Sequence, residues 1–333
     1  MSAVDTLPAW LRPFEPRLPL NQLVVEVNKI FHAFEAPSYD RRHPEIHQQL
    51  PAYWQEMIAQ AGVAPRNGGW RILDFGCGTG FASEQILRHL PAEQIASLVC
   101  YDLSPEMIDR CREKIAPKLP TAQFIWDAAS LAGSGPFDLL LTNSLLHHLP
   151  DPHATIRQLT DRLTPGAFWL AGHEPSTRYY KNPECLSLYR RYMRETQRQR
   201  GKKWWRHLSP SALGARWHRT ISKRSSPKRL AAYAAFEQGL FGRRPTPHVI
   251  DRIVDFHVAH TADEAAAGRG FDIDRLQAEL RGEWQLHWEF SYSYMGTLAE
   301  SRLPVEWRQA CRKLAREFPR DGANLCALWR RVA

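Results

Sequence analysis

Residues 70–80 read WRILDFGCGTG, a short apolar run that ends in three closely spaced glycines. Short, continuous apolar runs are typical of strands buried in a parallel sheet. Glycines allow a sharp turn and a close approach of a ligand to the backbone. In open α/β sheets, the turn after the first strand borders the usual binding crevice. This stretch therefore predicts an α/β fold with a ligand site at the carboxyl end of its first strand.

Four further apolar segments follow, separated by helical segments. The predicted strands cover residues 98–101, 123–126, 137–141 and 167–171. Between two of them, Ser104-Pro105 marks a helix start, because serine caps helices and proline suits their first position. Short strands joined by helical crossovers imply a doubly wound parallel sheet. Two more strands are predicted near the end of the chain, at 285–292 and 324–332, so the expected fold is a Rossmann-like sheet of seven strands.

The sequence predicts four parts along the chain. Residues 1–68 form an N-terminal helical arm, because apolar residues recur every three or four positions between 21 and 60. Residues 69–175 form the core with the first five strands. Residues 176–270 interrupt the pattern as a long basic insertion or cap, and residues 271–333 complete the core.

The net charge of the 333-residue chain is +9, but this charge is concentrated in one segment. Residues 176–230 contain sixteen Lys or Arg and two acidic residues, a local charge of +14, so the rest of the chain is at −5. Mean hydropathy is −0.45, and no apolar run approaches the roughly 20 residues of a membrane span. The first 20 residues lack the apolar centre of a secretory signal. Six scattered cysteines without a C-x-x-C pair indicate a reducing compartment. We therefore expect a cytoplasmic protein without a metal site.

The glycine spacing and two carboxylates indicate the ligand. A dinucleotide fingerprint would place its third glycine at position 81, which is Phe81, and the Lys-Ser/Thr pair of a phosphate loop is missing. Asp102 ends the second predicted strand, where a carboxylate can accept hydrogen bonds from a ribose diol. Asp127 ends the third, where it can accept from an adenine amino group. Leu103, Met107 and Trp126 would supply apolar walls. The sequence therefore predicts a nucleoside ligand without a pyrophosphate.

These motifs resemble those of the class I S-adenosylmethionine-dependent methyltransferases. The matching segments are ILDFGCGTG at 72–80, YDLSPEMI at 101–108, FDLLLTNSLLHHLPDP at 137–152 and LTPGAFWLAGHEP at 163–175. The resemblance covers about residues 70–175 and implies S-adenosylmethionine as cofactor. It places the three glycines on the methionine part, Asp102 on the ribose and Asp127 on the adenine. The segment at 36–40 is similar to the A-x-x-Y-D segment of small-molecule and quinone-type methyltransferases, which puts Tyr39 over the cofactor. The predicted cofactor residues are Tyr39, Asp74, Gly76, Cys77, Gly78, Gly80, Asp102, Leu103, Met107, Asp127, Ala128 and Asn143.

The predicted catalytic residues follow the fourth and fifth strands. His147 or His148 could accept a proton, because the ordinary pKa of histidine is near 6.5. Aromatic faces stabilise a cation such as a sulfonium. The predicted catalytic residues are Asn143, His147, Glu174, Tyr179 and Tyr180. Glu174 is expected to bind a substrate amine or hydroxyl. The histidines and tyrosines also have a structural alternative: one of the adjacent histidines packs inward, and the tyrosines belong to the core or an interface.

Methyl transfer to O, N or C of a small molecule is the expected reaction, because it mainly requires alignment of the reacting atoms and exclusion of water. Two alternatives use the same cofactor site. One is intramolecular cyclisation of S-adenosylmethionine to a cyclic amino acid with release of methylthioadenosine. The other is a non-catalytic module that binds the nucleoside as a structural ligand.

The basic insertion has four interpretations. It forms a membrane-surface element for a lipid or quinone substrate, a groove for RNA, a lid over an acidic small molecule or an acyl-carrier partner, or a solvated helical cap or homodimer interface. The place of the N-P-P-Y-type motif of RNA enzymes reads TNSL at 142–145, which argues against nucleic acid.

Overall fold

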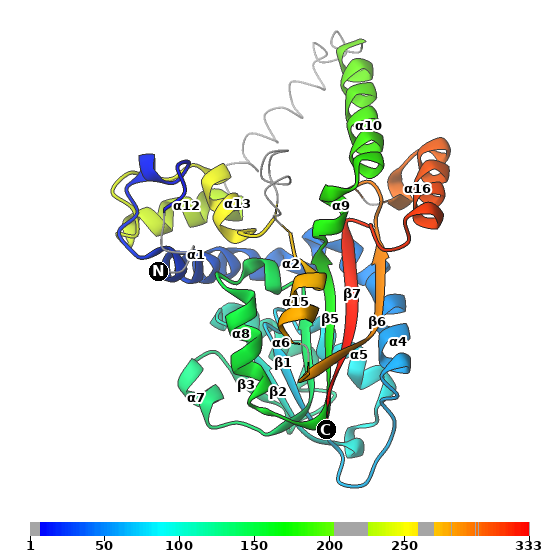
Figure 1. The fold of residues 1–333 in the computed structure, drawn as a ribbon. Coiled ribbons are helices and arrows are strands. Elements are labelled where there is room, and N and C mark those ends of the chain that lie inside the picture. The colour runs from blue at the N-terminus through cyan, green and yellow to red at the C-terminus, as the bar shows by residue number, and fades with distance from the viewer. Residues whose placement is uncertain are drawn as a thin grey trace.

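A seven-stranded sheet is the centre of the computed structural model, which describes residues 7–202, 226–258, 270–280, 282–296, 298 and 300–332 (Figure 1). The strand order is β3-β2-β1-β4-β5-β7-β6. The strands are β1 (Trp70–Phe75), β2 (Ile95–Tyr101), β3 (Gln123–Ile125), β4 (Phe137–Asn143), β5 (Leu163–Pro175), β6 (Trp284–Tyr292) and β7 (Asn324–Arg331). The predicted Rossmann-like sheet of seven strands is confirmed.

The first five strands are parallel, as predicted. The strand β7 lies between β5 and β6 and runs antiparallel to both, so the complete sheet is mixed. Helix α16 (Val305–Glu317) precedes β7 in the chain. Apolar patterning identifies these last strands but does not show that the final one inserts between its neighbours.

Helices cover both faces of the sheet, and the strands bury alternate side chains on each face. In β2, Leu98 and Cys100 face one apolar cluster, whereas Val99 and Tyr101 face the other. The first cluster contains α4 (Leu50–Gln60), α5 (Phe81–His89) and α6 (Pro105–Ile115). The second contains α7 (Ala128–Ala132), α8 (Pro152–Thr160) and α15 (Ile273–Glu279). The predicted cap of α6 is confirmed, because Ser104 Oγ accepts from the Met107 N–H.

The N-terminal segment is helical, as predicted, but it divides into several helices. Its elements are α1 (Leu20–Glu35), η2 (Ala36–Ser38), α2 (Tyr39–Arg42), α3 (Pro44–Gln48) and α4. Helix α4 packs against the sheet, whereas α1 lies beside two helices from the second half of the chain (Figure 1).

The insertion after β5 divides between two packing partners. Its first helices, α9 (Thr177–Lys181) and α10 (Pro183–Lys202), share an apolar cluster with α16. Its later helices, α12 (Pro227–Glu237) and α13 (Pro247–Val254), pack on α1. We call α1, α12 and α13 the helical lobe. The N-terminal arm and the insertion were predicted as separate parts. In the structure, α1 of the arm packs with α12 and α13 of the insertion to form the helical lobe. The Trp-containing basic segments at 202–206 and 216–219 lie outside the described residues, apart from the helical backbone at position 202.

All six cysteines are buried free thiols. Among the helices of the described residues, none has both the length and the apolar composition that crossing a membrane requires.

Candidate active site

The glycine turn after β1 is held against the end of β2. The N–H groups of Gly76 and Cys77 donate to the carbonyl oxygen of Tyr101 at 2.8 and 2.9 Å. Gly76 has a φ of +71°, and a Cβ atom added there would lie 2.5 Å from Leu145 Cδ1. Gly78 has a φ of +51°, but an added Cβ would meet nothing within 4 Å. Close packing therefore requires glycine at position 76, whereas Gly78 exposes its backbone to open space.

Two strand-end carboxylates fix the helices that follow the turn. Asp74 is fully buried, and its Oδ2 accepts from the N–H and Oγ–H of Ser83 at 3.0 and 2.6 Å. Burial raises the pKa of the Asp74 carboxyl to about 8. Asp102 accepts from the Gly78 N–H and the Ser104 N–H, each at 2.9 Å. Burial also raises the pKa of Asp102, and His32 together with these two N–H groups opposes the rise. Asp102 thus joins the glycine turn to the start of α6.

A cavity of about 940 Å³ lies at the carboxyl ends of the central strands. Helix α1 contributes Asn28 and His32 to its wall. Nine of the predicted cofactor residues line it: Tyr39, Gly76, Cys77, Gly78, Asp102, Leu103, Met107, Ala128 and Asn143. The other three, Asp74, Gly80 and Asp127, are not wall residues.

Those three residues make structural contacts instead. Asp74 bonds Ser83, as described above. A Cβ at Gly80 would lie 2.9 Å from Cys111 Sγ, so this glycine permits close packing of α5 and α6. Asp127 is exposed and caps α7 by accepting from the Ser130 N–H at 2.7 Å. Asp127 is thus a helix cap outside the cavity wall, and the predicted adenine contact has no support from this arrangement.

The donor set of this cavity fits a nucleoside cofactor. Asp102 presents a carboxylate whose orientation is fixed by two backbone N–H groups. Leu103, Met107 and Leu131 supply apolar wall for a ring, and the open space over Gly78 allows close approach to the backbone. Cavities of roughly 300–1,000 Å³ with few polar groups are typical of cofactor sites.

A second cavity of about 350 Å³ adjoins the first. Five residues line both cavities: His32, Tyr39, Ile46, Ser144 and His148. The second cavity also contains His147 and Tyr180 from the predicted catalytic set, together with Asp251 and Asp255 of the helical lobe. The lobe and the carboxyl edge of the sheet therefore enclose a space next to the cofactor cavity.

Glu174 orients the imidazole ring of His147 through a hydrogen bond. Glu174 is fully buried and lies in neither cavity wall. It accepts from the N–H groups of Leu145 and Leu146 at 2.8 and 2.9 Å, and its Oε2 lies 2.9 Å from His147 Nδ1. Burial disfavours the charged form of His147, but the hydrogen bond to Glu174 and the charges of Glu174 and Asp255 outweigh this effect and raise the pKa of His147. Glu174 is thus a positioning residue rather than a substrate ligand.

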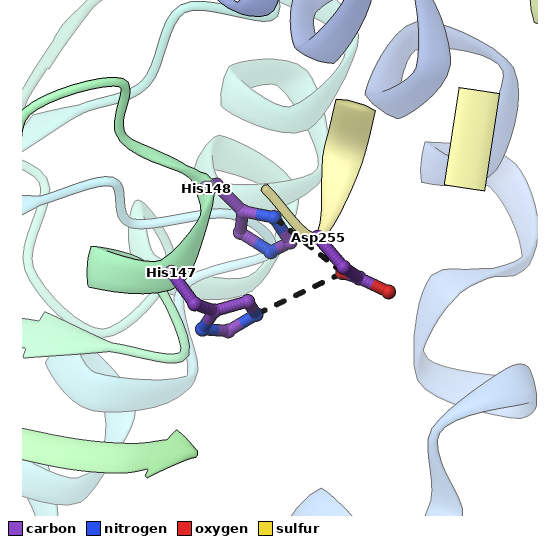
Figure 2. Close-up of side chains that lie close together, drawn as sticks. All are labelled: His147, His148 and Asp255. Atoms are coloured by element: carbon purple, nitrogen blue, oxygen red, sulfur yellow. Dashed lines mark ion pairs between the residues drawn. The ribbon is translucent and has the colours of Figure 1, made fainter. Parts of the chain in front are cut away.

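His147, His148 and Asp255 form a compact group at the edge of the second cavity (Figure 2). Each offers one potential metal-ligand atom within 4.8 Å of the others. Asp255 Oδ1 lies 4.0 Å from His147 Nε2 and 3.7 Å from His148 Nδ1. His148 Nδ1 also lies 2.7 Å from the Val254 carbonyl oxygen, which can only accept. This nitrogen therefore carries a hydrogen, and the lone pair of the neutral ring is on Nε2. Because Asp255 lies beside both imidazole rings, we interpret the group as an acid–base cluster.

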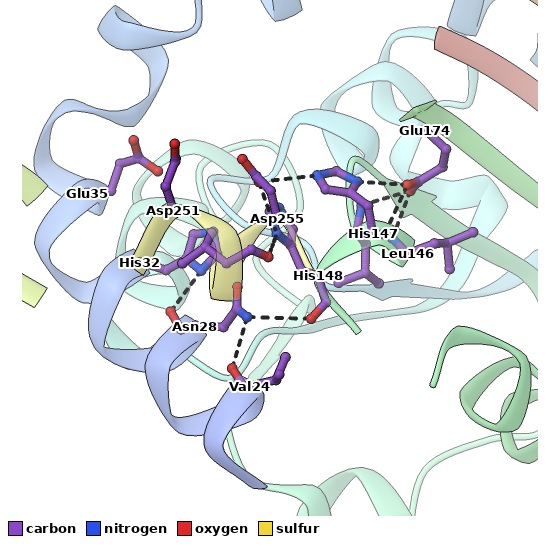
Figure 3. Close-up of polar contacts among 12 residues, drawn as sticks. Val24, Asn28, His32, Glu35, Leu146, His147, His148, Glu174, Asp251 and Asp255 are labelled. Atoms are coloured by element: carbon purple, nitrogen blue, oxygen red, sulfur yellow. Dashed lines mark hydrogen bonds and ion pairs between the residues drawn. The ribbon is translucent and has the colours of Figure 1, made fainter. Parts of the chain in front are cut away.

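The turn after β4 is hydrogen-bonded to α1 and to the end of α13, two helices of the helical lobe (Figure 3). His148 Nδ1 donates to Val254 of α13, and the His257 N–H donates to the His147 carbonyl oxygen at 3.1 Å. His257 Nε2 donates to the Leu149 carbonyl oxygen at 2.8 Å. From α1, the Asn28 side chain reaches the His148 carbonyl oxygen at 3.5 Å. The lobe is thus attached to the histidine turn itself.

The remaining predicted catalytic residues lie in three different places. Tyr180 lines the second cavity. Tyr179 is 2% exposed, packs in the cluster of α9, α10 and α16, and lines neither cavity, in agreement with its core alternative. Asn143 lines the first cavity, and its Oδ1 accepts from Trp54 Nε1–H at 3.0 Å.

Sequence reasoning places Ser144 at the lip of this crevice without giving it a role, and it missed other wall residues, chiefly His32 and Asp255. His32 and Asp255 come from helical segments whose facing partners are distant in sequence. Ser144 has a φ of +54°, an uncommon backbone conformation for serine. Its position directly after Asn143 was the available signal.

Comparison with known proteins identifies the core. Residues 73–169 match the family of methyltransferase domains. Trans-aconitate 2-methyltransferase of Pseudomonas aeruginosa strain PAO1 is 37% identical over 111 residues, which cover 32% of this chain and 37% of that protein. Malonyl-[acyl-carrier protein] O-methyltransferase of Paenibacillus sp. strain JDR-2 is 27% identical over 187 residues, or 54% of this chain and 66% of that protein. The chain thus spans less than two thirds of the length of either relative.

Among solved structures, the plantazolicin methyltransferase BpumL in complex with a pentazolic desmethylPZN analog and SAH aligns with a TM-score of 0.45 and 15% identity. The alignment covers 94% of this chain and 98% of that one. Cofactor assignment depends on the matched domain and on the glycine turn, Asp102 and the cavity that they border. Residues 73–169 are therefore a methyltransferase domain, and the site that they border has the features of a class I S-adenosylmethionine-dependent methyltransferase.

Proposed function

We propose that the protein transfers a methyl group from S-adenosylmethionine to a small-molecule acceptor bound in the second cavity. The observation that supports this proposal is the shared wall of the two cavities, formed by residues such as Tyr39 and Ser144. One cavity is large enough for the cofactor, and the other provides a polar site beside it. When bound, the cofactor supplies an activated methyl group on a sulfonium.

The side chains have distinct roles in this proposal. Gly76, Gly78 and Asp102 hold the cofactor, and Asn143, fixed by Trp54, borders its reacting end. Tyr39 and Tyr180 place aromatic faces beside the junction and the acceptor. Enclosure by the lobe excludes water and aligns the reactants, an effect that contributes about 7–11 kcal/mol in favourable cases.

His147 is the proposed proton acceptor. Its Nδ1–H donates to Glu174, which leaves Nε2 available toward Asp255 and the second cavity. The acceptor O–H or N–H loses its proton to this nitrogen as the methyl group is received. General-base assistance of this kind typically contributes a factor of 10²–10⁴.

The nucleoside product tests the proposal. Purified protein is incubated with methyl-labelled S-adenosylmethionine, with and without a cell extract that retains its proteins, and products are identified by mass spectrometry. Methyl transfer gives S-adenosylhomocysteine and a labelled extract component. Methylthioadenosine formed without extract would instead establish cyclisation, and absence of turnover with retained cofactor binding would establish a binding module.

A variant pair tests the role of His147. His147→Gln should lower turnover at least 100-fold while the affinity for S-adenosylhomocysteine stays within about threefold. His153→Gln is the matched control, because His153 pairs with Glu279 at 2.7 Å outside both cavities. Full turnover in His147→Gln would contradict the assignment of the base.

A further inference from the structure

Helix α10 projects from the body of the protein (Figure 1). Its sequence carries a row of arginines. Arg190, Arg194 and Arg198 follow one another at one-turn spacing, and Arg191 adjoins the first. All four are exposed. We call these four residues the basic row. At 1.5 Å per residue, it extends over about 12 Å of helix.

The basic row is not neutralised within the described part of the chain. None of its four guanidinium groups forms an ion pair with another described residue. By contrast, Arg110 and Arg112 of α6 pair with acids three residues away in the sequence at 2.8 and 2.6 Å. Like charges one turn apart destabilise a helix. Arg191 stacks on the Trp307 ring at 5.2 Å, and Arg194 Nε donates to the Arg190 carbonyl oxygen at 3.3 Å. No described acid offsets the repulsion among the four cations, which points to a role outside folding.

The base of α10 is fixed and borders the second cavity. Tyr192 packs edge-to-face on Trp307 of α16 with ring centroids 5.1 Å apart. A Cβ added at Gly296, a residue that lines the second cavity, would lie 3.4 Å from the Tyr189 ring. Tyr189 directly precedes the basic row. A partner bound to this row would therefore lie beside the cavity in which we place the acceptor.

The composition of this face distinguishes between classes of partner. Membrane-surface helices place large apolar side chains next to their cations. The exposed large apolar side chains of the described residues lie on other elements, such as Phe34 on α1 and Tyr233 on α12. Single-stranded nucleic acid is held by exposed aromatic faces, but Tyr189 and Tyr192 are half-buried against neighbouring residues. An acidic protein surface requires neither feature.

We propose that the basic row docks an acidic carrier protein, which presents a tethered acceptor to the second cavity. This inference rests on the proposed function for the position of the acceptor. Charge complementarity with a row of acidic side chains would hold the partner, and the attraction would weaken as salt screens it.

Binding to a purified acyl carrier protein tests the docking. The full chain is titrated without S-adenosylmethionine into fluorescently labelled carrier at 50 and 200 mM NaCl. We expect saturable binding that weakens at least tenfold at the higher salt. The triple variant Arg190→Glu, Arg194→Glu, Arg198→Glu should bind at least tenfold more weakly than the wild type at 50 mM NaCl.

A matched charge reversal serves as control. Arg88→Glu, Arg110→Glu, Arg112→Glu changes the same net charge on α5 and α6 and should bind the carrier within about twofold of wild type. Thermal unfolding of both variants checks that they fold. Equal loss in the two variants, or no carrier binding at 50 mM NaCl, would overturn the proposal.

Two further probes separate the rival partners. A 20-nucleotide RNA and vesicles of phosphatidylserine and phosphatidylcholine are titrated under the same conditions. Tighter binding of either one than of the carrier, lost in the triple variant of α10, would assign the row to that partner instead. Because the binding assay contains no cofactor, its failure would leave methyl transfer standing, and failed turnover would leave docking standing.

Discussion

At the scale of single residues, carboxylates at strand ends have different roles according to what surrounds them. Asp102 lines the cofactor cavity, Asp74 is buried behind it, and Asp127 caps an exposed helix. All three occupy equivalent positions in the sequence pattern. Their surroundings, which involve residues such as Ser83 and Ser130, distinguish a ligand contact from a helix anchor.

Asp102→Asn should weaken binding of S-adenosylhomocysteine by about 1–3 kcal/mol, because a charged acceptor is replaced by a neutral one. Isothermal titration calorimetry measures the change. Asp109→Asn in the neighbouring helix α6 is the control, since that carboxylate is exposed and pairs with Arg112. Unchanged affinity in Asp102→Asn would refute the assignment of Asp102 to the cofactor.

Asp74 should make stability fall as pH rises. Its pKa is about 8 in the folded protein and near 3.9 in unfolded chains. The folded state therefore keeps a proton that the unfolded chain releases between about pH 4 and pH 8, so this residue destabilises the fold progressively across that window. The slope is at most about 1.4 kcal/mol per pH unit.

Asp74→Asn cannot titrate and should remove this slope. Thermal unfolding of both proteins at pH 5, 6, 7 and 8 compares them. The melting temperature of the wild type should decline relative to that of the variant as pH increases. Parallel curves would show that Asp74 is ionised throughout.

At the scale of elements, the glycine turn combines a left-handed backbone, which glycine adopts freely, with one close contact. Gly76 and Gly78 both have positive φ, but only Gly76 lies against Leu145. A methyl group therefore has different consequences at these two positions.

Gly76→Ala should destabilise the protein by about 2–4 kcal/mol, because it adds a steric clash to the backbone cost. Gly78→Ala should cost about 1–2 kcal/mol, from the backbone alone. Urea unfolding of both variants measures these values. Equal losses would indicate that Leu145 moves aside without cost.

The sequence was sufficient to predict these elements because local patterns determine them. The run before Gly76 and the cap at Ser104 each depend on a few neighbouring residues. Positions such as Asp255 depend on contacts between segments about a hundred residues apart, for example between Val254 and His148. No local pattern encodes such a contact, so the nine wall residues and the two histidines could be predicted, whereas the position of Asp255 beside the histidines could not.

At the scale of the whole molecule, the wall of the cofactor cavity depends on a late segment of the chain. Helix α1 supplies Asn28 and His32 to that wall, and its apolar face packs on α12 and α13. Ile250 of α13 is fully buried in this contact. A substitution that loosens the packing of the lobe should therefore weaken cofactor binding.

Ile250→Ala should destabilise the lobe by about 2–5 kcal/mol, because it leaves a cavity between α13 and α1. Amide exchange in α1 should accelerate, and affinity for S-adenosylhomocysteine should decrease. Ile115→Ala in α6, equally buried but in the sheet cluster, is the comparison. If Ile250→Ala loses stability while α1 keeps its protection, the lobe is not a cooperative unit.

The pairing of α1 with α12 and α13 also affects how the protein is made. A ribosome releases α1 early, but its packing partners begin to emerge only after 192 further residues, the distance from Glu35 to Pro227, have been added. Until then the apolar face of α1 has no α12 or α13 to cover it, and one wall of the cofactor site is incomplete. Nucleoside capture should thus be among the last abilities that the growing polypeptide acquires.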